Sequence, residues 1–124
     1  MKFHSLTKED LTDHGSLKAR FDEGHQIGAV CVAKDHLFVR KGLKNYFIAY
    51  GDADRIFKRV RTVTANVCCE GGEFRFDYLV IHRNGEEILE VQLPGEKAGK
   101  ILFDELRTLN PPCDLSAPEK PEAV

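Results

Sequence analysis

At 124 residues the chain is long enough for one domain that buries about two thirds of its unfolded surface. Its 42% apolar and 31% charged residues are ordinary for a globular protein, and no apolar run approaches the ~20 residues needed to span a bilayer. The net charge of −2 argues against a general nucleic-acid binder, and the polar N-terminus lacks a signal-peptide core, so we expect a cytoplasmic protein.

The first third of the chain predicts short elements. Thr7–His14 has the capping pattern of a short helix that Gly15 ends, within an N-terminal extension over residues 1–15. Ser16–Asp22 alternates apolar and charged side chains, which predicts a strand. Further strands are predicted at Gln26–Ala33, Leu37–Arg40 and Tyr46–Tyr50.

The stretch from Arg55 to Cys68 changes its pattern along its length. Ile56, Phe57 and Val60 have helical spacing, so one helical turn is expected to begin at Asp54. From Val60 onward the residues are β-branched and alternate, which predicts a strand. Gly71-Gly72 is then expected to close a hairpin into the next strand.

The clearest prediction is a β-hairpin formed by Phe74–His82 and Glu87–Leu93. Asn84-Gly85 is the strongest short-range hairpin signal, because both central residues of a type I′ turn need a positive φ. This turn pairs Arg83 with Glu86. Counting back places three pairs on one face: Val80 with Leu89, Tyr78 with Val91, and Phe76 with Leu93.

A helix is predicted over about Glu96–Leu109. Glu96 in its first turn and Arg107 in its last suit the helix dipole, and Asn110-Pro111-Pro112 stops it. The proline-rich segment 111–124 is expected to be disordered. One apolar stripe is predicted, with Phe103 at its border: Ala98, Ile101, Leu102, Leu106 and Leu109.

The order of elements is about seven strands followed by one helix. It is carried by YFIAYGDADRIFKRV, by FDYLVIHRNGEEILEVQLP and by AGKILFDELRTLNP. Over residues 16–110 this order resembles the pleckstrin-homology-like superfold of PH, PTB and GRAM domains, and small bacterial proteins similar in layout. The resemblance implies a mainly β fold with α, in which about seven mostly antiparallel strands form a barrel of two orthogonal sheets. A C-terminal amphipathic helix at about 96–109 closes this barrel.

The charges are unevenly distributed, and residues 34–61 carry +5 while residues 62–124 carry −6. The candidate ligand-binding residues are seven of the eight bases of this positive region: Arg55, Lys58, Arg59, Arg61, Arg40, Lys41 and Lys44. Together they could form a face for a phosphate, an anionic lipid or an acidic peptide. A solvated polar surface, or salt bridges to the acidic C-terminal half within a monomer or a homodimer, would satisfy the same charges.

No constellation of catalytic or metal-binding residues is evident in the sequence. Adjacent Cys68-Cys69 side chains on a strand would point to opposite faces, so they cannot easily share a metal ion. Gly95–Lys100 (GEKAGK) is one residue short of a phosphate-binding loop and falls at a predicted helix start. We therefore expect no metal, no cofactor and no enzymatic activity.

Three functions remain open at this point. The first is a non-enzymatic interaction module that holds a protein or peptide at a sheet edge or on the barrel surface. The second is peripheral binding of anionic lipid headgroups, or of other phosphate-bearing ligands, through the basic cluster. The third is weak single-stranded nucleic-acid binding through interleaved aromatic side chains. The net charge of −2 makes this function the least favoured of the three.

Overall fold

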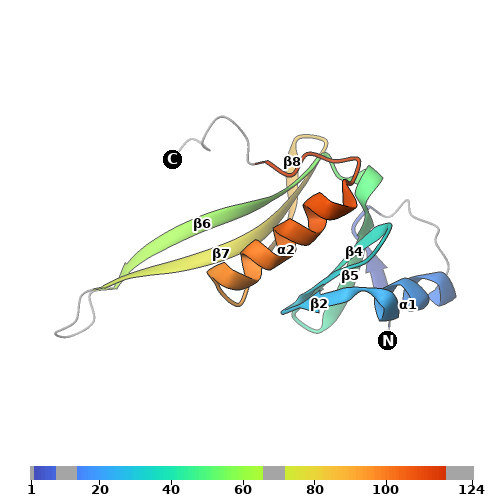
Figure 1. Ribbon diagram of the computed structural model, residues 1–124, viewed down its shortest axis with the longest axis horizontal. Helices are drawn as coiled ribbons and strands as arrows, with labels where there is room; N and C mark the ends of the chain where they lie inside the picture. Colours follow the sequence, from blue (N-terminus) through green and yellow to red (C-terminus); the bar gives the residue numbers. More distant parts are fainter. Residues whose placement is uncertain (1, 8–13, 66–71, 117–124) are drawn as a thin grey trace.

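The computed structural model describes residues 2–7, 14–65 and 72–116, which form eight strands and two α-helices (Figure 1). The larger sheet has the order β1-β5-β4-β3-β2, and the smaller sheet has the order β6-β7-β8. Strand β1 is parallel to β5, and all other neighbours are antiparallel. The strands are β1 Phe3–Ser5, β2 His25–Ile27, β3 Val30–Val32, β4 His36–Lys41, β5 Lys44–Ala49, β6 Arg55–Ala65, β7 Gly72–Arg83 and β8 Glu86–Gln92. The helices are α1 His14–Glu23 and α2 Glu96–Leu109, and a short 3-10 turn covers Tyr50–Asp52.

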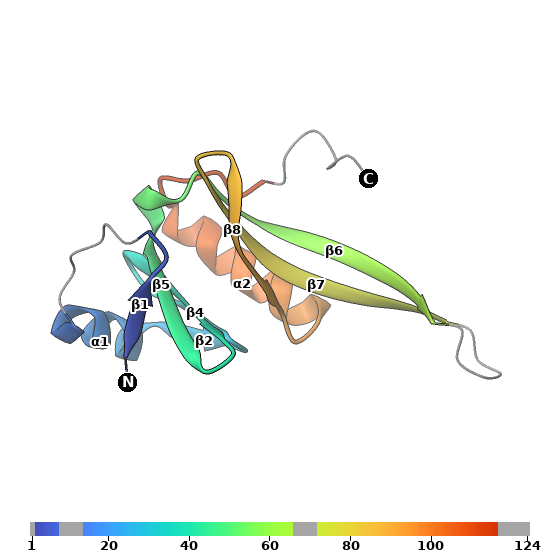
Figure 2. The same cartoon turned by 180° about the vertical axis from the view of Figure 1, so that it is seen from behind.

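The main core lies where α2 packs against both sheets (Figures 1 and 2). Leu102 and Leu106 of this helix are completely buried. Both sheets contribute residues to the same cluster, among them Val30, Leu37, Ile48, Ile56, Leu79 and Ile81. The mainly β composition and the C-terminal helix are therefore confirmed.

The two sheets do not close into a barrel, so that part of the sequence prediction is wrong. No strand of one sheet pairs with a strand of the other among the described residues. Helix α2 contributes its own buried face to the core between the sheets, and a helix with its side chains is about 10 Å across. The sheet edges are thus held too far apart for the hydrogen bonds that closure needs.

The smaller sheet continues beyond the body as a two-stranded ribbon. Strand β8 pairs with β7 only over Tyr78–Arg83, whereas β6 pairs with β7 over its whole length. The remaining part, residues 61–65 with residues 72–76, is called the β6–β7 arm. It projects from one side of the molecule in both views (Figures 1 and 2).

The Asn84-Gly85 turn is confirmed, but the register behind it is not. Both residues have positive φ, 55° and 77°, and Arg83 pairs with Glu86 as predicted. A bulge between Ile81 and His82 then shifts the pairing by one residue. The pairs on the core side are therefore Ile81 with Leu89 and Leu79 with Val91.

The strand predicted at Ser16–Asp22 is wrong, because these residues belong to helix α1. Leu17 and Phe21 are four residues apart and both pack against the second cluster, on the other face of the larger sheet. Ala19, which a strand would place beside them, is exposed. Residues 8–13 of the predicted N-terminal helix lie outside the described residues, and Phe3–Ser5 join the larger sheet.

Two more elements differ from the prediction. Gln26–Ala33 is not one strand but parts of β2 and β3, joined by a tight turn in which Gly28 has a φ of +59°. The helical turn expected at Asp54 is wrong, because β6 already begins at Arg55. The predicted turn at Gly71-Gly72 and the Cys68-Cys69 pair fall outside the described residues, apart from Gly72, where β7 begins.

The bounds of α2 agree with the prediction, but the buried face of the helix is narrower than the predicted apolar stripe. Leu102, Leu106 and Phe103 are buried, whereas Ile101 and Leu109 are 41% and 40% exposed. None of the helices in the described ranges is long and apolar enough to cross a bilayer.

This orientation predicts different costs for two leucines of the same stripe. Leu106→Ala should lower the free energy of unfolding by about 2–5 kcal/mol, because it opens a cavity in the shared core. Leu109→Ala should cost less than about 1 kcal/mol. Urea denaturation followed by circular dichroism measures both, and equal costs would contradict the orientation of α2.

Candidate anion-binding cleft

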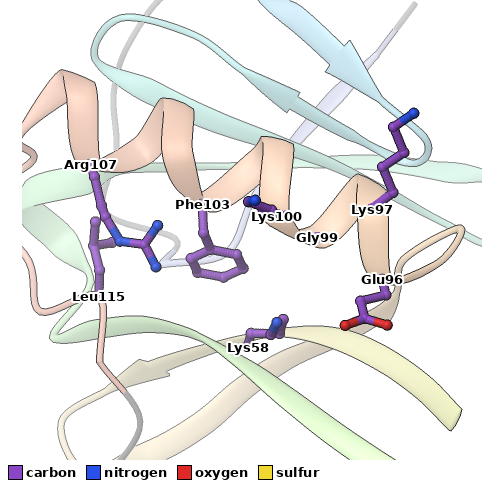
Figure 3. A pocket seen from close by; sticks show the side chains of 8 residues that line it. All are labelled: Lys58, Glu96, Lys97, Gly99, Lys100, Phe103, Arg107 and Leu115. Carbon is purple, nitrogen blue, oxygen red and sulfur yellow. The ribbon is translucent and has the colours of Figure 1, made fainter.

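A cleft of about 620 Å³ lies between α2 and β6, and we call it the α2–β6 cleft. Figure 3 shows the Phe103 ring between Arg107 on one side and Lys58 and Glu96 on the other, with Lys97 turned away. Most of its lining residues come from the first three turns of α2. The lining residues are Lys58, Glu96, Lys97, Gly99, Lys100, Phe103, Arg107 and Leu115.

The floor of the cleft depends on Gly99. A Cβ atom at this position would lie 3.3 Å from Cδ of Lys58 and 3.4 Å from Oδ2 of Asp77. The missing side chain therefore lets the first turns of α2 lie close to the sheet. Phe103, one turn later, is 4% exposed and forms the apolar part of the floor.

A buried carboxylate lies beneath the floor. Asp77 is 2% exposed, accepts a hydrogen bond of 2.9 Å from Nε of Arg75, and lies 4.0 Å from Nζ of Lys58. The hydrogen bond to Asp77 raises the pKa of Arg75. Arg75 also pairs with Glu96 at 3.3 Å, so the acidic groups near the floor are already engaged.

The basic groups of the cleft are less fully engaged. Lys97 and Lys100 make no ion pair with any carboxylate in the part of the chain that the structure describes. Arg107 pairs with Asp104 at 2.9 Å, but both side chains are more than half exposed, so solvent screens this pair. Even without Lys97, which is turned away, three basic side chains face only Glu96 as an acid, so the lining of the cleft is positive.

One end of the cleft is occupied by the chain itself. The amide of Ile56 donates to the carbonyl of Asp114 at 2.8 Å, and the amide of Asp114 donates to the carbonyl of Asp54 at 3.1 Å. These bonds form a parallel bridge between Asp114 and Arg55. Cys113–Ser116, here the C-terminal segment, thus lies on the β6 edge, and its Leu115 lines the cleft.

Side chains reinforce this attachment. Arg55 donates a hydrogen bond of 2.6 Å to the carbonyl of Ser116 and lies 3.4 Å from the Asp114 carboxylate. The hydroxyl and the amide of Ser116 hold the pKa of Asp114 below its usual value. Burial raises the pKa of the Cys113 thiol to about 11, which agrees with its packing against the main core.

Beyond the C-terminal segment, no described part of the chain pairs with the outer edge of β6. Backbone groups of alternate residues point to the same side of a strand, so Lys58, Val60 and Thr62 share the side on which Ile56 meets Asp114. Strand β7 is the only strand neighbour of β6 within the described residues. An extended chain could therefore add to this edge.

The structure divides the seven predicted basic residues among three places. Lys58 faces α2 and lines the cleft, whereas Arg55, Arg59 and Arg61 lie on the other face of the smaller sheet, as strand alternation requires. Arg40, Lys41 and Lys44 lie at the turn between β4 and β5 in the larger sheet. The seven residues do not form one face.

The β6 arginines on the outer face are neutralised by carboxylates. Arg59 pairs with Glu87 at 2.8 Å and with Glu90 at 2.7 Å, and Arg61 pairs with Glu90 at 2.9 Å. Their guanidinium groups also stack on aromatic rings, Arg59 at 5.7 Å from Phe57 and Arg61 at 5.4 Å from the ring of Tyr78. This is the salt bridging to the acidic C-terminal half that the sequence left open.

The sequence analysis missed the contribution of α2 to the cleft. In the sequence Arg107 has only a favourable place relative to the helix dipole, and Lys97 and Lys100 occur only in the GEKAGK stretch, which does not fit a phosphate-binding loop. Lys100 and Arg107 are seven residues apart and share one helix face, which was a usable signal. Which strand that face would meet could not be known without the tertiary structure.

Nothing in the described residues suggests a metal centre, since no group of three or more His, Cys, Asp or Glu side chains could hold an ion there. Comparisons with protein-family models, with curated proteins and with solved structures find no match to this chain. The function is therefore argued from the geometry of the cleft.

The C-terminal segment provides a test of how the end of the cleft is held. Arg55→Ala should speed iodoacetamide alkylation of Cys113 about three- to tenfold, because the segment loses its bonds to that arginine. Cys31, a buried thiol whose pKa is also raised to about 11, is the internal control, and Arg61→Ala is the matched variant. Peptide mapping by mass spectrometry reads each site. An unchanged Cys113 rate would show that Arg55 does not hold the segment.

Proposed function

We propose that the protein is a non-enzymatic interaction module that binds an extended acidic segment of a partner protein beside β6, with its carboxylates in the α2–β6 cleft. The observation that carries this proposal is the C-terminal segment, which already lies on the β6 edge through one parallel bridge, Asp114 with Arg55. A second extended chain can bond to the equivalent outward-facing backbone groups farther along β6, at Lys58, Val60 and Thr62.

The charge of the cleft favours an acidic ligand. In a strand laid on β6, alternate side chains point toward α2, as Leu115 does. Carboxylates at these positions would meet Lys58 and Lys100, whose charges are at most partly compensated by described acids. The other side chains would lie on the face where Arg59 and Arg61 are already neutralised.

Strand addition is also the mode by which PTB domains hold peptides. The proposed kinship with PH-like domains, supported by the order of strands and the C-terminal helix, fits this mode. The open sheets differ from the closed barrel of PH-like domains. The binding mode proposed for this chain, however, requires only the edge of β6 and the helix beside it.

We predict that a fluorescein-labelled peptide of alternating Glu and Thr residues binds, and that raising the salt from about 0.05 M to about 0.5 M weakens binding about tenfold. Lys100→Glu should weaken binding at least about tenfold, because it reverses a charge in the cleft. Lys34→Glu, the same change at an exposed position outside the cleft, should alter it less than about twofold.

Fluorescence anisotropy gives these affinities, and two further peptides separate charge from strand pairing. A peptide with Lys in place of Glu should not bind. An acidic peptide N-methylated at alternate residues keeps its charge but loses its donors, so it should bind much more weakly. If the N-methylated peptide binds as tightly as the unmethylated acidic peptide, strand addition is refuted. If the Lys100→Glu variant binds the acidic peptide as tightly as the wild type, the cleft is not the binding site.

A further inference from the structure

A second basic surface, at the turn between β4 and β5, consists of side chains that form no ion pairs with described carboxylates. Arg40, Lys41 and Lys44 make no ion pair with any described carboxylate, in contrast to the β6 arginines. Lys2 is also exposed and without such a pair in the described part of the chain. The name hairpin tip is used below for residues 40–44 together with Lys2.

The hairpin tip carries an apolar side chain that the fold does not use. Leu43 is 95% exposed, the highest value among the exposed large apolar residues of the described chain. It occupies a two-residue turn in which Gly42 has a φ of +64°, and where small polar residues are normally preferred. A leucine at this position stabilises nothing within the monomer.

The charges at the tip are also placed unfavourably for the isolated protein. Lys41 and Lys44 are directly opposite each other in the β4–β5 pairing, and like charges at such positions repel. The parallel pairing of Phe3 with Asn45 brings Lys2 to the same end of β5. A negatively charged, partly apolar environment would relieve the repulsion and cover Leu43 at the same time.

The position of the tip leaves it accessible. The turn between β4 and β5 lies at the same end of the molecule as the N-terminus, and the β6–β7 arm points elsewhere (Figures 1 and 2). Apart from Gly42 and its two chain neighbours, no atom of the described residues lies within 4 Å of where a Cβ of Gly42 would be, so the turn is convex and open. A convex tip cannot enclose one small anion, but it can press against an extended surface.

We propose that the hairpin tip contacts the surface of a bilayer that contains anionic phospholipids. Lys2, Arg40, Lys41 and Lys44 lie against the phosphate groups, and Leu43 enters the interfacial region. The exposed leucine and the absence of an aromatic side chain from positions 40–44 favour lipid over single-stranded nucleic acid, which binds by base stacking. This contact does not depend on the α2–β6 cleft, which lies on other elements.

The test is co-sedimentation with vesicles of phosphatidylcholine alone and of phosphatidylcholine with about 30% phosphatidylserine. The protein should bind only the anionic vesicles, and less at high salt. Lys41→Glu with Lys44→Glu should lower the partition coefficient about 25-fold or more, and Leu43→Ser about tenfold. Lys34→Glu with Arg61→Glu, the same change of charge elsewhere, should retain most of the binding.

Insertion can be measured directly, because the chain contains no tryptophan. In Leu43→Trp the new indole should show a blue-shifted emission on the anionic vesicles, whereas Leu109→Trp, at an exposed site on α2, should not. Three results would each overturn the proposal: no binding to anionic vesicles at low salt, binding that survives both hairpin substitutions, or complete competition by soluble glycerophosphoserine. Unchanged circular dichroism of the variants confirms that they are folded.

Discussion

The packing of α2 against both sheets is the interaction on which the rest of the structure depends. Leu102 and Leu106 fill the space that a barrel would close, so the sheets stay open and share one core with the helix. The close approach permitted by Gly99 then sets the first turns of α2 beside β6. The α2–β6 cleft is thus a direct consequence of how the core is built.

The distribution of ion pairs separates structural charges from charges that remain available. Arg59 and Arg61 share Glu90 and stack on aromatic rings, so they fix the outer face of the smaller sheet. Lys100 and the bases of the hairpin tip have no such partner among the described residues. Because surface pairs are screened and individually weak, the unpaired groups cost the fold little and are the ones that a ligand can use.

The sequence predicted the features that local chemistry decides. Asn84-Gly85 needed positive φ at both residues, and the bounds of α2 followed from its periodicity and from the prolines behind it. The bulge after Ile81 could not be read, because no local residue type requires it. Helix α1 was missed because Leu17 and Phe21 fit both a strand and a helix, and only their packing on the larger sheet decides. The seven predicted basic residues lie in three separate places, because the tertiary structure decides which sheet and which face each one occupies. This cannot be predicted from their positions in the sequence.

The most direct measurement for the central claim is amide hydrogen exchange by NMR, with and without the acidic peptide. We predict that the amides of Lys58, Val60 and Thr62 exchange fast in the free protein and become protected in the complex, because each gains a carbonyl partner. The amides of Phe57 and Arg59, which face β7, should change little. Binding that leaves Lys58, Val60 and Thr62 unprotected would contradict strand addition at the β6 edge.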